Sequence, residues 1–318
     1  GKAQFGVSEN GTLVYVPGST SESGRKLVWV DRQGTVKLLM APPRQYETPR
    51  ISPNGQRVAV SIGYDIWIYD IRRRMLTRLT FGGKSKSPLW TPDGKRVTFS
   101  SGRDVTSCQL LWKAANGGGP EELLMQSERS IQASSWSPDG QVLVFVSGIG
   151  IDRGDIWLLP LQGERKPRPF LQTQFKEATV VFSPDGHRLA YTSNESGRFE
   201  DYVQSFPGPG PSWQISTNGG DQPVWARNGK ELFYREENKM MAVEVRTRPT
   251  FSTGIPAPLF AGQYQHSPSL GPTDYDVTPD GKRFLMIQPG AQEPTATQIN
   301  VVLNWFEELK RRVGSGGK

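Results

Sequence analysis

The chain has 318 residues, 35% hydrophobic and 22% charged, which suits a globular protein with a modest core. Its net charge of +7 would allow a nucleic acid or an anionic surface as partner. However, its basic clusters, such as Arg72–Arg74 and Lys310–Arg312, are short, scattered and outside any nucleic-acid-binding motif. We therefore expect no nucleic-acid partner. The single cysteine, Cys108, excludes an internal disulfide, and apolar runs such as Val142–Val146 are too short to insert in a membrane.

Seven Asn-Gly or Asp-Gly turns recur along the chain, and most follow a Ser-Pro or Thr-Pro pair. They are Asn10-Gly11, Asn54-Gly55, Asp93-Gly94, Asp139-Gly140, Asp185-Gly186, Asn228-Gly229 and Asp280-Gly281. Their glycines are separated by 44, 39, 46, 46, 43 and 52 residues. Proline presets the turn, Asn or Asp binds nearby amides, and glycine accepts a positive φ. A period of about 40–50 residues in a strand-rich pattern indicates the blades of a β-propeller.

Each repeat predicts four short antiparallel strands around its turn. The first strand ends at an apolar residue three positions before the Asn or Asp, which we expect to be buried: Val7, Ile51, Trp90, Trp136, Phe182, Trp225 and Val277. The second strand follows the turn at once, the third has an aromatic centre, as in 65–68, and the fourth is weaker, as in 77–80. The pattern predicts an all-β, seven-bladed propeller of four-stranded antiparallel blades, with six or eight blades as alternatives.

The repeats run from end to end and predict one domain over residues 1–313. Blades would start near residues 3, 47, 86, 132, 178, 221 and 273. The seventh repeat has a third strand over 299–303 and then a short C-terminal helix over 304–313. Asn304 is the expected N-cap, with Glu307 and Glu308 in the first turn of this helix and basic residues in the last. Residues 314–318 are expected to be a flexible tail or residues added to the natural chain. How the ring closes is left open.

The Asn/Asp-Gly turns are nearly uniform, whereas the loops between second and third strands vary: 17–25, 101–109, 147–154, 193–200 and 288–298. These loops and the connections between blades share the face opposite the turns. Variable loops on a rigid scaffold are where recognition is usually built. The predicted ligand- or partner-binding residues on this rim are Arg44, Tyr46, Glu47, Arg129, Gln132, Lys176, Glu177, Asp221, Gln222, His266 and Asp274.

Catalytic and metal-binding patterns are missing from the sequence. There is no Gly-x-Ser-x-Gly nucleophile motif, and only two histidines, His187 and His266, could serve as a base. His187 follows a repeat turn and is expected at the surface, so His266 alone would be worth testing. The turn aspartates occur once per blade and are therefore too far apart to share a metal. We expect a non-enzyme with no catalytic residues, no cofactor and no metal site.

Several motifs resemble known families. Trp136-Ser137-Pro138-Asp139-Gly140, followed by Asp155-Ile156-Trp157, resembles the PD40 repeats of TolB-type propellers over essentially the whole chain. More narrowly, four segments are similar to the C-terminal propeller of bacterial membrane serine/threonine protein kinases: 27–32, 193–198, 206–210 and 302–309. One position departs from this pattern, because Asp201 stands where similar sequences have an apolar residue.

The kinase resemblance implies a kinase domain in cis and a propeller on the periplasmic or extracellular side of the membrane. The leading hypothesis is therefore a monomeric, non-catalytic sensor module that binds a protein or small ligand through its rim. The alternatives are a TolB-like envelope scaffold and the propeller of a peptidase or hydrolase.

Overall fold

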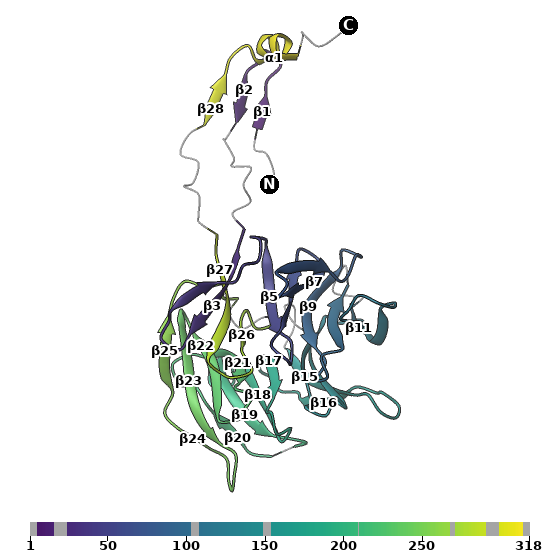
Figure 1. The fold of residues 1–318 in the computed structure, drawn as a ribbon, viewed down its shortest axis with the longest axis vertical. Helices are drawn as coiled ribbons and strands as arrows, with labels where there is room; N and C mark the ends of the chain where they lie inside the picture. Colours follow the sequence, from purple (N-terminus) through teal and green to yellow (C-terminus); the bar gives the residue numbers. More distant parts are fainter. Residues whose placement is uncertain are drawn as a thin grey trace. The chain divides into compact units, whose positions relative to one another are not determined.

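The computed structural model describes residues 5–15, 24–102, 108–148, 154–208, 210–267, 271–290 and 299–313 (Figure 1). The chain forms two compact units, one from Arg25–Gln288 and one from Gly1–Gly24 with Pro289–Lys318. We therefore describe each unit by itself. The predicted tail 314–318 lies outside the described residues.

The unit Arg25–Gln288 contains five antiparallel sheets built from consecutive strands. The first two are β5 (Tyr46–Ile51), β6 (Arg57–Ile62), β7 (Asp65–Asp70) and β8 (Met75–Arg78), then β9 (Ser85–Trp90), β10 (Arg96–Ser101), β11 (Cys108–Ala114) and β12 (Glu122–Ser127). The next two are β13 (Ile131–Trp136), β14 (Val142–Ser147), β15 (Asp155–Pro160) and β16 (Arg168–Leu171), then β17 (Glu177–Phe182), β18 (Arg188–Ser193), β19 (Glu200–Ser205) and β20 (Ser212–Gln214). The fifth contains β21 (Asp221–Trp225), β22 (Glu231–Glu236), β23 (Lys239–Arg246), β24 (Ser252–Thr253) and β25 (Ala257–Ala261).

A sixth sheet of this unit joins its two ends, and we call it the closure sheet. It contains β26 (Asp276–Val277), β27 (Arg283–Gln288), β3 (Lys26–Asp31) and β4 (Val36–Leu38), in that order. Strands β27 and β3 pair antiparallel along their whole length, from Arg283 opposite Asp31 to Gln288 opposite Lys26. The six sheets of the unit surround a central axis lined by the first strand of each sheet, which we call the inner strand (Figure 1).

The other unit holds a seventh, three-stranded sheet and the helix. Its sheet contains β1 (Phe5–Val7), β2 (Leu13–Tyr15) and β28 (Asn300–Val302), in the order β1-β2-β28. Helix α1 (Trp305–Val313) begins one residue after Asn304, and the Trp305 amide donates to the Gly11 carbonyl at 2.6 Å. The all-β propeller with a short C-terminal helix is thus confirmed, but the first and last repeats share their strands differently from the prediction. Strand β28 pairs with β2 instead of β27, and β3 pairs with β27.

The inner strands begin at Tyr46, Ser85, Ile131, Glu177, Asp221 and Asp276, close to the blade starts expected from the repeats. The apolar residue at the end of each of these six inner strands is buried, as predicted. The seventh such residue, Val7 in the other unit, is 44% exposed, so the prediction is wrong there. The indoles also link neighbouring sheets, because Trp90 donates from Nε1 to the Arg50 carbonyl at 2.9 Å. Trp136 donates likewise to Thr98 Oγ1 at 3.2 Å. In these two blades the recurrent tryptophan therefore bonds its blade to the preceding one.

The turn at Thr91–Arg96 shows why the repeat uses these residue types. Asp93 Oδ1 accepts from Thr91 Oγ1 at 2.6 Å and from the Lys95 amide at 3.0 Å. The hydrogen bond from Thr91, with help from the amide, holds the pKa of Asp93 below its usual value. Gly94 has a φ of 66°, which is left-handed and favours glycine. The same hydroxyl-to-carboxylate pair recurs at Ser137–Asp139, so the turn is a folding device.

Replacing Gly94 by alanine should destabilise the propeller unit by about 1 kcal/mol, because the new Cβ would be held at positive φ. For a unit of this size that lowers the Tm by about 2–4 °C in a thermal unfolding experiment.

The matched control is Gly82→Ala, since a Cβ at Gly82 meets no atom within 4 Å and its φ is not left-handed. An equal loss of Tm in both variants would contradict the role given to the turn conformation.

Candidate functional site

The inner strands enclose a channel cavity of about 190 Å³. Each sheet contributes the next-to-last residue of its inner strand: Arg50, Leu89, Ser135, Val181, Val224 and Asp276. At the end of the cavity nearest the Asn/Asp-Gly turns, which we call the turn face, Arg227 donates from Nη1 to the Pro53 carbonyl at 2.6 Å. The opposite end of the inner strands is the rim.

Two opposite charges face this cavity. Arg50 Nη1 donates to the Pro49 carbonyl at 2.7 Å and the Thr273 carbonyl at 2.8 Å. Asp276 accepts the Ile51 amide on Oδ2 at 2.6 Å. Burial lowers the pKa of Arg50, and Asp276 opposes this shift. Burial likewise raises the pKa of Asp276, with Arg50 opposing. Neither residue was predicted from the sequence, although each lies four residues before the Asn or Asp of its turn.

Four inner strands contain a residue with left-handed φ at the same distance from the turn. These are Thr48 (51°), Ser87 (57°), Thr179 (35°) and Gln222 (59°). The strand registers shift at these positions, as between Asp221 and Val224. Such bulges redirect side chains and are frequent beside functional sites. Two of these side chains reach another segment at the rim, because Thr179 Oγ1 donates to the Gly271 carbonyl and Gln222 Nε2 donates to the Ser267 carbonyl.

Four of the predicted binding residues come together at the rim: Asp221, Gln222, His266 and Asp274. We call them the rim cluster. His266 Nε2 lies 2.8 Å from Asp221 Oδ1. The Asp274 amide donates to Gln222 Oε1 at 2.9 Å, and the Tyr275 hydroxyl donates to the Gln222 carbonyl at 2.9 Å. The cluster joins the β21 sheet to the closure sheet.

A buried arginine that the sequence analysis missed lies behind the rim cluster. Arg235, on β22 directly opposite Asp221, is only 2% exposed, and its Nη2 donates to the Glu237 carbonyl at 3.0 Å. Among the described residues, its Nε and Nη1 have no hydrogen-bond partner. Burial lowers the pKa of Arg235, while Tyr275, Asp221 and Asp274 oppose the shift. This guanidinium therefore balances the two carboxylates of the rim cluster.

The connection 262–275 crosses the inner edge of the β21 sheet. The Gln265 amide donates to the Ile287 carbonyl of β27 at 2.7 Å. Further along, the Gly271 carbonyl accepts from Thr179 Oγ1 of β17 at 2.9 Å. Because Gly271 contacts β17 while Thr273 and Tyr275 line the channel cavity, this described part of the connection lies at the channel mouth. Residues 268–270 lie outside the described residues.

The remaining predicted binding residues do not join the rim cluster. Tyr46 and Glu177 are buried, whereas Arg44, Arg129 and Lys176 are exposed, and Gln132 is partly buried. Tyr46 donates its hydroxyl to the Pro42 carbonyl, which makes it a packing residue. Glu47 lies between Arg25 and Lys86, at 3.7 and 3.9 Å. Much of the variable loops 17–25, 101–109, 147–154 and 288–298 lies outside the described residues.

His187 is exposed at its turn, as expected. Within the described ranges, no group of three or more His, Cys, Asp or Glu side chains is arranged to hold a metal ion. No helix in the described part of the chain is long and apolar enough to cross a membrane.

Comparisons with known proteins agree with this architecture. A family model described as the TolB beta propeller domain, PD40, matches residues 7–150. The protein assigned as TolB in Agrobacterium tumefaciens superimposes with a TM-score of 0.68 at 15% identity, covering 84% of this chain and 98% of that one. TolB from Acinetobacter baumannii gives 0.51 at 17% identity, covering 86% and 66%. An oligogalacturonate lyase in complex with manganese gives 0.57 at 12% identity, covering 92% and 96%.

A search of curated proteins finds no matching sequence. Residues 7–150 thus carry PD40-type repeats, and the likeness in structure shows the β-propeller fold.

Glu177 makes folding stability depend on pH. Burial raises the pKa of Glu177 to about 7, with a smaller opposing effect from the Thr173 hydroxyl, which donates to Oε1 at 2.5 Å. Between the ordinary pKa near 4.5 and about 7, the folded state binds more protons than the unfolded state, so stability falls as pH rises. Glu177→Gln should remove this decline in the free energy of unfolding, which amounts to about 3 kcal/mol at most. Thermal unfolding of both proteins from pH 4 to 8 measures the decline.

Glu128→Gln on the neighbouring connection is the control, because Glu128 is exposed. A decline that persists unchanged in Glu177→Gln would show that another group is responsible.

Proposed function

We propose that this chain is a non-catalytic binding module that recognises a protein or a small ligand at the rim of its channel. The observation that supports the proposal is the convergence of the rim cluster and the connection 262–275 over one mouth of the ring. The turn face at the opposite end is built from nearly uniform turns that serve the fold. Polar loops positioned by a rigid scaffold are the usual form of such a binding surface.

Three exposed basic side chains lie at this rim, each in the segment just before an inner strand: β5, β13 or β17. Arg44, Arg129 and Lys176 are exposed. Among the described residues, none of these three side chains takes part in a hydrogen bond or an ion pair. They are therefore free to contact a partner without first breaking an internal interaction.

We assign a structural role to His266, the one histidine at the rim. The ring of His266 is hydrogen-bonded to Asp221, as in many catalytic pairs. However, no serine or cysteine side chain within the described part of the chain is hydrogen-bonded to His266, so the pair has no nucleophile among the described residues. The Asp221–His266 contact instead fastens the connection 262–275 to β21.

A rim variant should lose its partner while a matched turn-face variant keeps it. The rim variant is Arg44→Ala, Arg129→Ala and Lys176→Ala, and the control is Lys95→Ala, Lys230→Ala and Lys282→Ala. Both remove three exposed cations, and the control residues lie directly after the turn glycines. Photo-crosslinking of each purified variant in an envelope extract would compare capture of the same partner band.

We expect the band with the wild type and the control, and at least a tenfold loss with the rim variant, because several exposed ionic contacts are removed together. Equal capture by both variants, or a loss confined to the turn-face control, would overturn the assignment to the rim.

We also propose that the module is the extracytoplasmic part of a signalling protein with a kinase domain in cis. Support comes from the kinase-propeller motifs in the sequence and from the PD40 match. In the natural protein, alkaline phosphatase fused at the propeller should be active, since this enzyme works only outside the cytoplasm. A fusion that is inactive while a fluorescent cytoplasmic reporter at the same site is bright would contradict this location.

A further inference from the structure

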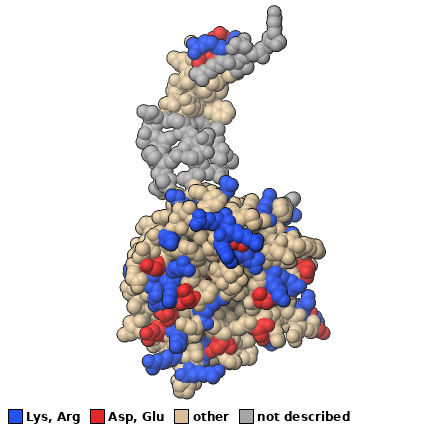
Figure 2. Space-filling model, viewed as in Figure 1, with Lys and Arg blue, Asp and Glu red and all other residues tan. Residues whose placement is uncertain are grey.

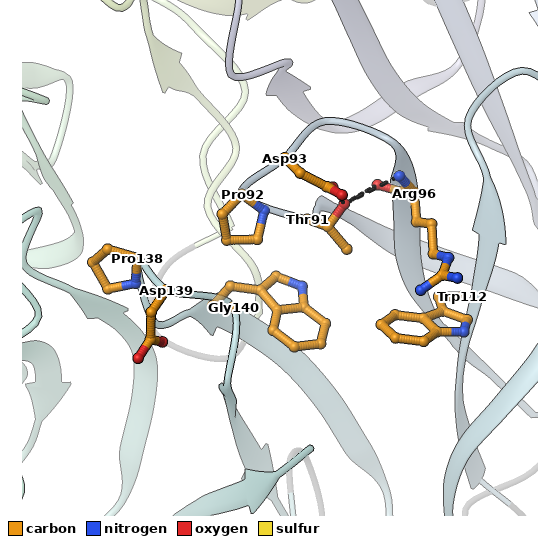
Figure 3. Close-up of a pocket in the computed structure, with 9 residues that line it drawn as sticks. Thr91, Pro92, Asp93, Arg96, Trp112, Pro138, Asp139 and Gly140 are labelled. Carbon is orange, nitrogen blue, oxygen red and sulfur yellow. Dashed lines mark hydrogen bonds between the residues drawn. The ribbon is translucent and has the colours of Figure 1, made fainter. Parts of the chain in front are cut away.

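A groove on the turn face lies between the β9 and β13 sheets and has a volume of about 480 Å³ (Figure 3). Its lining includes Asp93, Arg96, Trp112, Trp136, Asp139 and Gly140. The indoles of Trp112 and Trp136 are nearly parallel, with an interplanar angle of 21° and ring centroids 6.0 Å apart. The groove thus brings two aromatic rings together with two turns that each carry an aspartate, Asp93 and Asp139. The groove is remote from the rim and independent of the proposed function.

The equivalent groove between the β5 and β9 sheets is filled by an arginine of the chain itself. Arg57, at the start of β6, places its Cζ 4.8 Å from the ring centroid of Trp90. Its Nη2 donates to the Gly94 carbonyl at 3.1 Å, and its Nη1 donates to the Ala115 carbonyl at 3.3 Å. Trp90 and Gly94 hold the same places in their blade as Trp136 and Gly140 in the next one.

Arg96 is the counterpart of Arg57, but it does not cross to the next blade. Its Cζ lies 4.2 Å from the ring centroid of Trp112, on its own sheet (Figure 3). Trp112 is paired with Thr98, two residues along β10 from Arg96. A diagonal neighbour of this kind is within reach of long side chains. The self-stacking keeps Arg96 away from the face of Trp136.

The same rule holds in the two other sheets of the unit that have an arginine at this place. In the closure sheet, Trp29 is the diagonal neighbour, and Arg283 stacks on it at 5.0 Å. In the β17 sheet the diagonal neighbour is Val203, which offers no aromatic face. There Arg188 crosses to the next blade, where its Cζ lies 5.2 Å from the ring of Phe251. The diagonal residue thus decides whether an arginine fills the groove toward the next blade.

The groove between the β9 and β13 sheets also contains two carboxylates, Asp93 and Asp139, that are only partly satisfied by hydrogen bonds within the chain. Oδ1 of Asp139 accepts from Ser137 Oγ at 2.5 Å and from the Gln141 amide at 3.0 Å. Asp93 is bound in the same way. In the described structure, Oδ2 of neither carboxylate has a hydrogen-bond partner. With Arg96 as the one cation in the lining, the groove has a formal charge of −1 on a chain whose net charge is +7.

We propose that this groove is a binding site for an arginine side chain presented by a partner protein. The guanidinium would lie against the paired indoles and would donate to the Gly140 carbonyl, as Arg57 does to the Gly94 carbonyl, and to the free carboxylate oxygens. A planar cation with several donors suits this set better than the compact ammonium of lysine. The volume leaves room for the residues that flank the arginine.

The test uses the pentapeptide acetyl-Gly-Ser-Arg-Ser-Gly-amide, followed by NMR through the indole N–H signals of Trp112 and Trp136 at low salt. A peptide with citrulline in place of arginine keeps the shape of the side chain without its charge. A peptide with lysine keeps the charge but lacks the planar guanidinium with its several N–H donors. N-acetylarginine amide distinguishes a free small molecule from an arginine within a chain. We expect the arginine peptide to bind at least tenfold more tightly than the other three probes.

Two sets of variants separate the groove from the rest of the turn face. Asp93→Asn with Asp139→Asn should weaken binding of the arginine peptide about tenfold. Asparagine keeps the turn intact, because Asn54 and Asn228 already occupy equivalent turns with the same amide contacts. The control with an equal change of charge is Asp185→Asn with Asp280→Asn, in turns that do not line this groove.

Arg96→Gln gives a change of opposite sign, since removal of the one lining cation should tighten binding severalfold. The proposal is overturned if the citrulline or lysine peptide binds as tightly as the arginine peptide, or if the control weakens binding as much as Asp93→Asn with Asp139→Asn. It is also overturned if the free amide binds as tightly as the peptide. Because no rim residue is changed, failure here leaves the proposed rim function standing, and the converse also holds.

Discussion

The antiparallel ladder between β27 and β3 is the constraint on which the propeller unit depends. It joins residues 283–288 to residues 26–31, whereas each of the other five sheets of the unit uses strands that follow one another in the chain. The entropic cost of closing so long a loop grows only slowly with its length, and a full-length ladder with buried apolar residues offsets it. Leu285 and Ile287 pack with Leu27 and Trp29 in one core. The channel, the rim and the grooves between sheets exist only because this closure brings the last inner strand beside the first.

Local chemistry made much of this fold predictable. The Pro-Asp-Gly pattern marks positions where the backbone must turn with positive φ, so it located the turns and the inner strands before them. Helix α1 follows from equally local rules, with Glu307 and Glu308 in its first turn. The partners of β3 could not be predicted in this way. The apolar run in Lys26–Asp31 suits pairing with β2 or with β27, and only contacts distant in sequence decide between them.

The candidate site was predictable only in part, for a related reason. Loop variation indicated the rim, and Asp221, Gln222, His266 and Asp274 do converge there. Tyr46 and Glu177 begin their inner strands as Asp221 does, but they form local hydrogen bonds, with the Pro42 carbonyl and the Thr173 hydroxyl, and do not join the cluster. Arg235 could have been found from the repeat itself. It stands where other blades carry Ser61, Ser100 or Thr192, and so large a cation at a buried position requires acidic neighbours.

Figure 2 shows Lys and Arg spread over the viewed face of the propeller unit, with fewer Asp and Glu among them. Arginines at one place in the repeat, two residues after the turn glycine, have two different roles. Arg57 and Arg188 serve the fold, because each seals the groove between its own sheet and the next. Arg96 and Arg283 are held on their own sheets by a tryptophan. A single diagonal position, occupied by Trp112 in one blade and by Ile68 in another, therefore governs whether a groove remains open to other molecules.

Arg227 adds resistance to shear that the hydrogen-bond ladders within the sheets do not provide. It belongs to the β21 sheet and replaces the proline of the other turns of this unit, yet its guanidinium binds the carbonyls of Pro53 and Ser52 at the end of β5. The closure sheet lies between these two sheets. The bond thus acts as a diagonal brace across the channel. A ring of blades can be sheared into an oval with little change between neighbouring sheets, but this contact resists such a distortion beside the closure sheet, where the two ends of the unit meet.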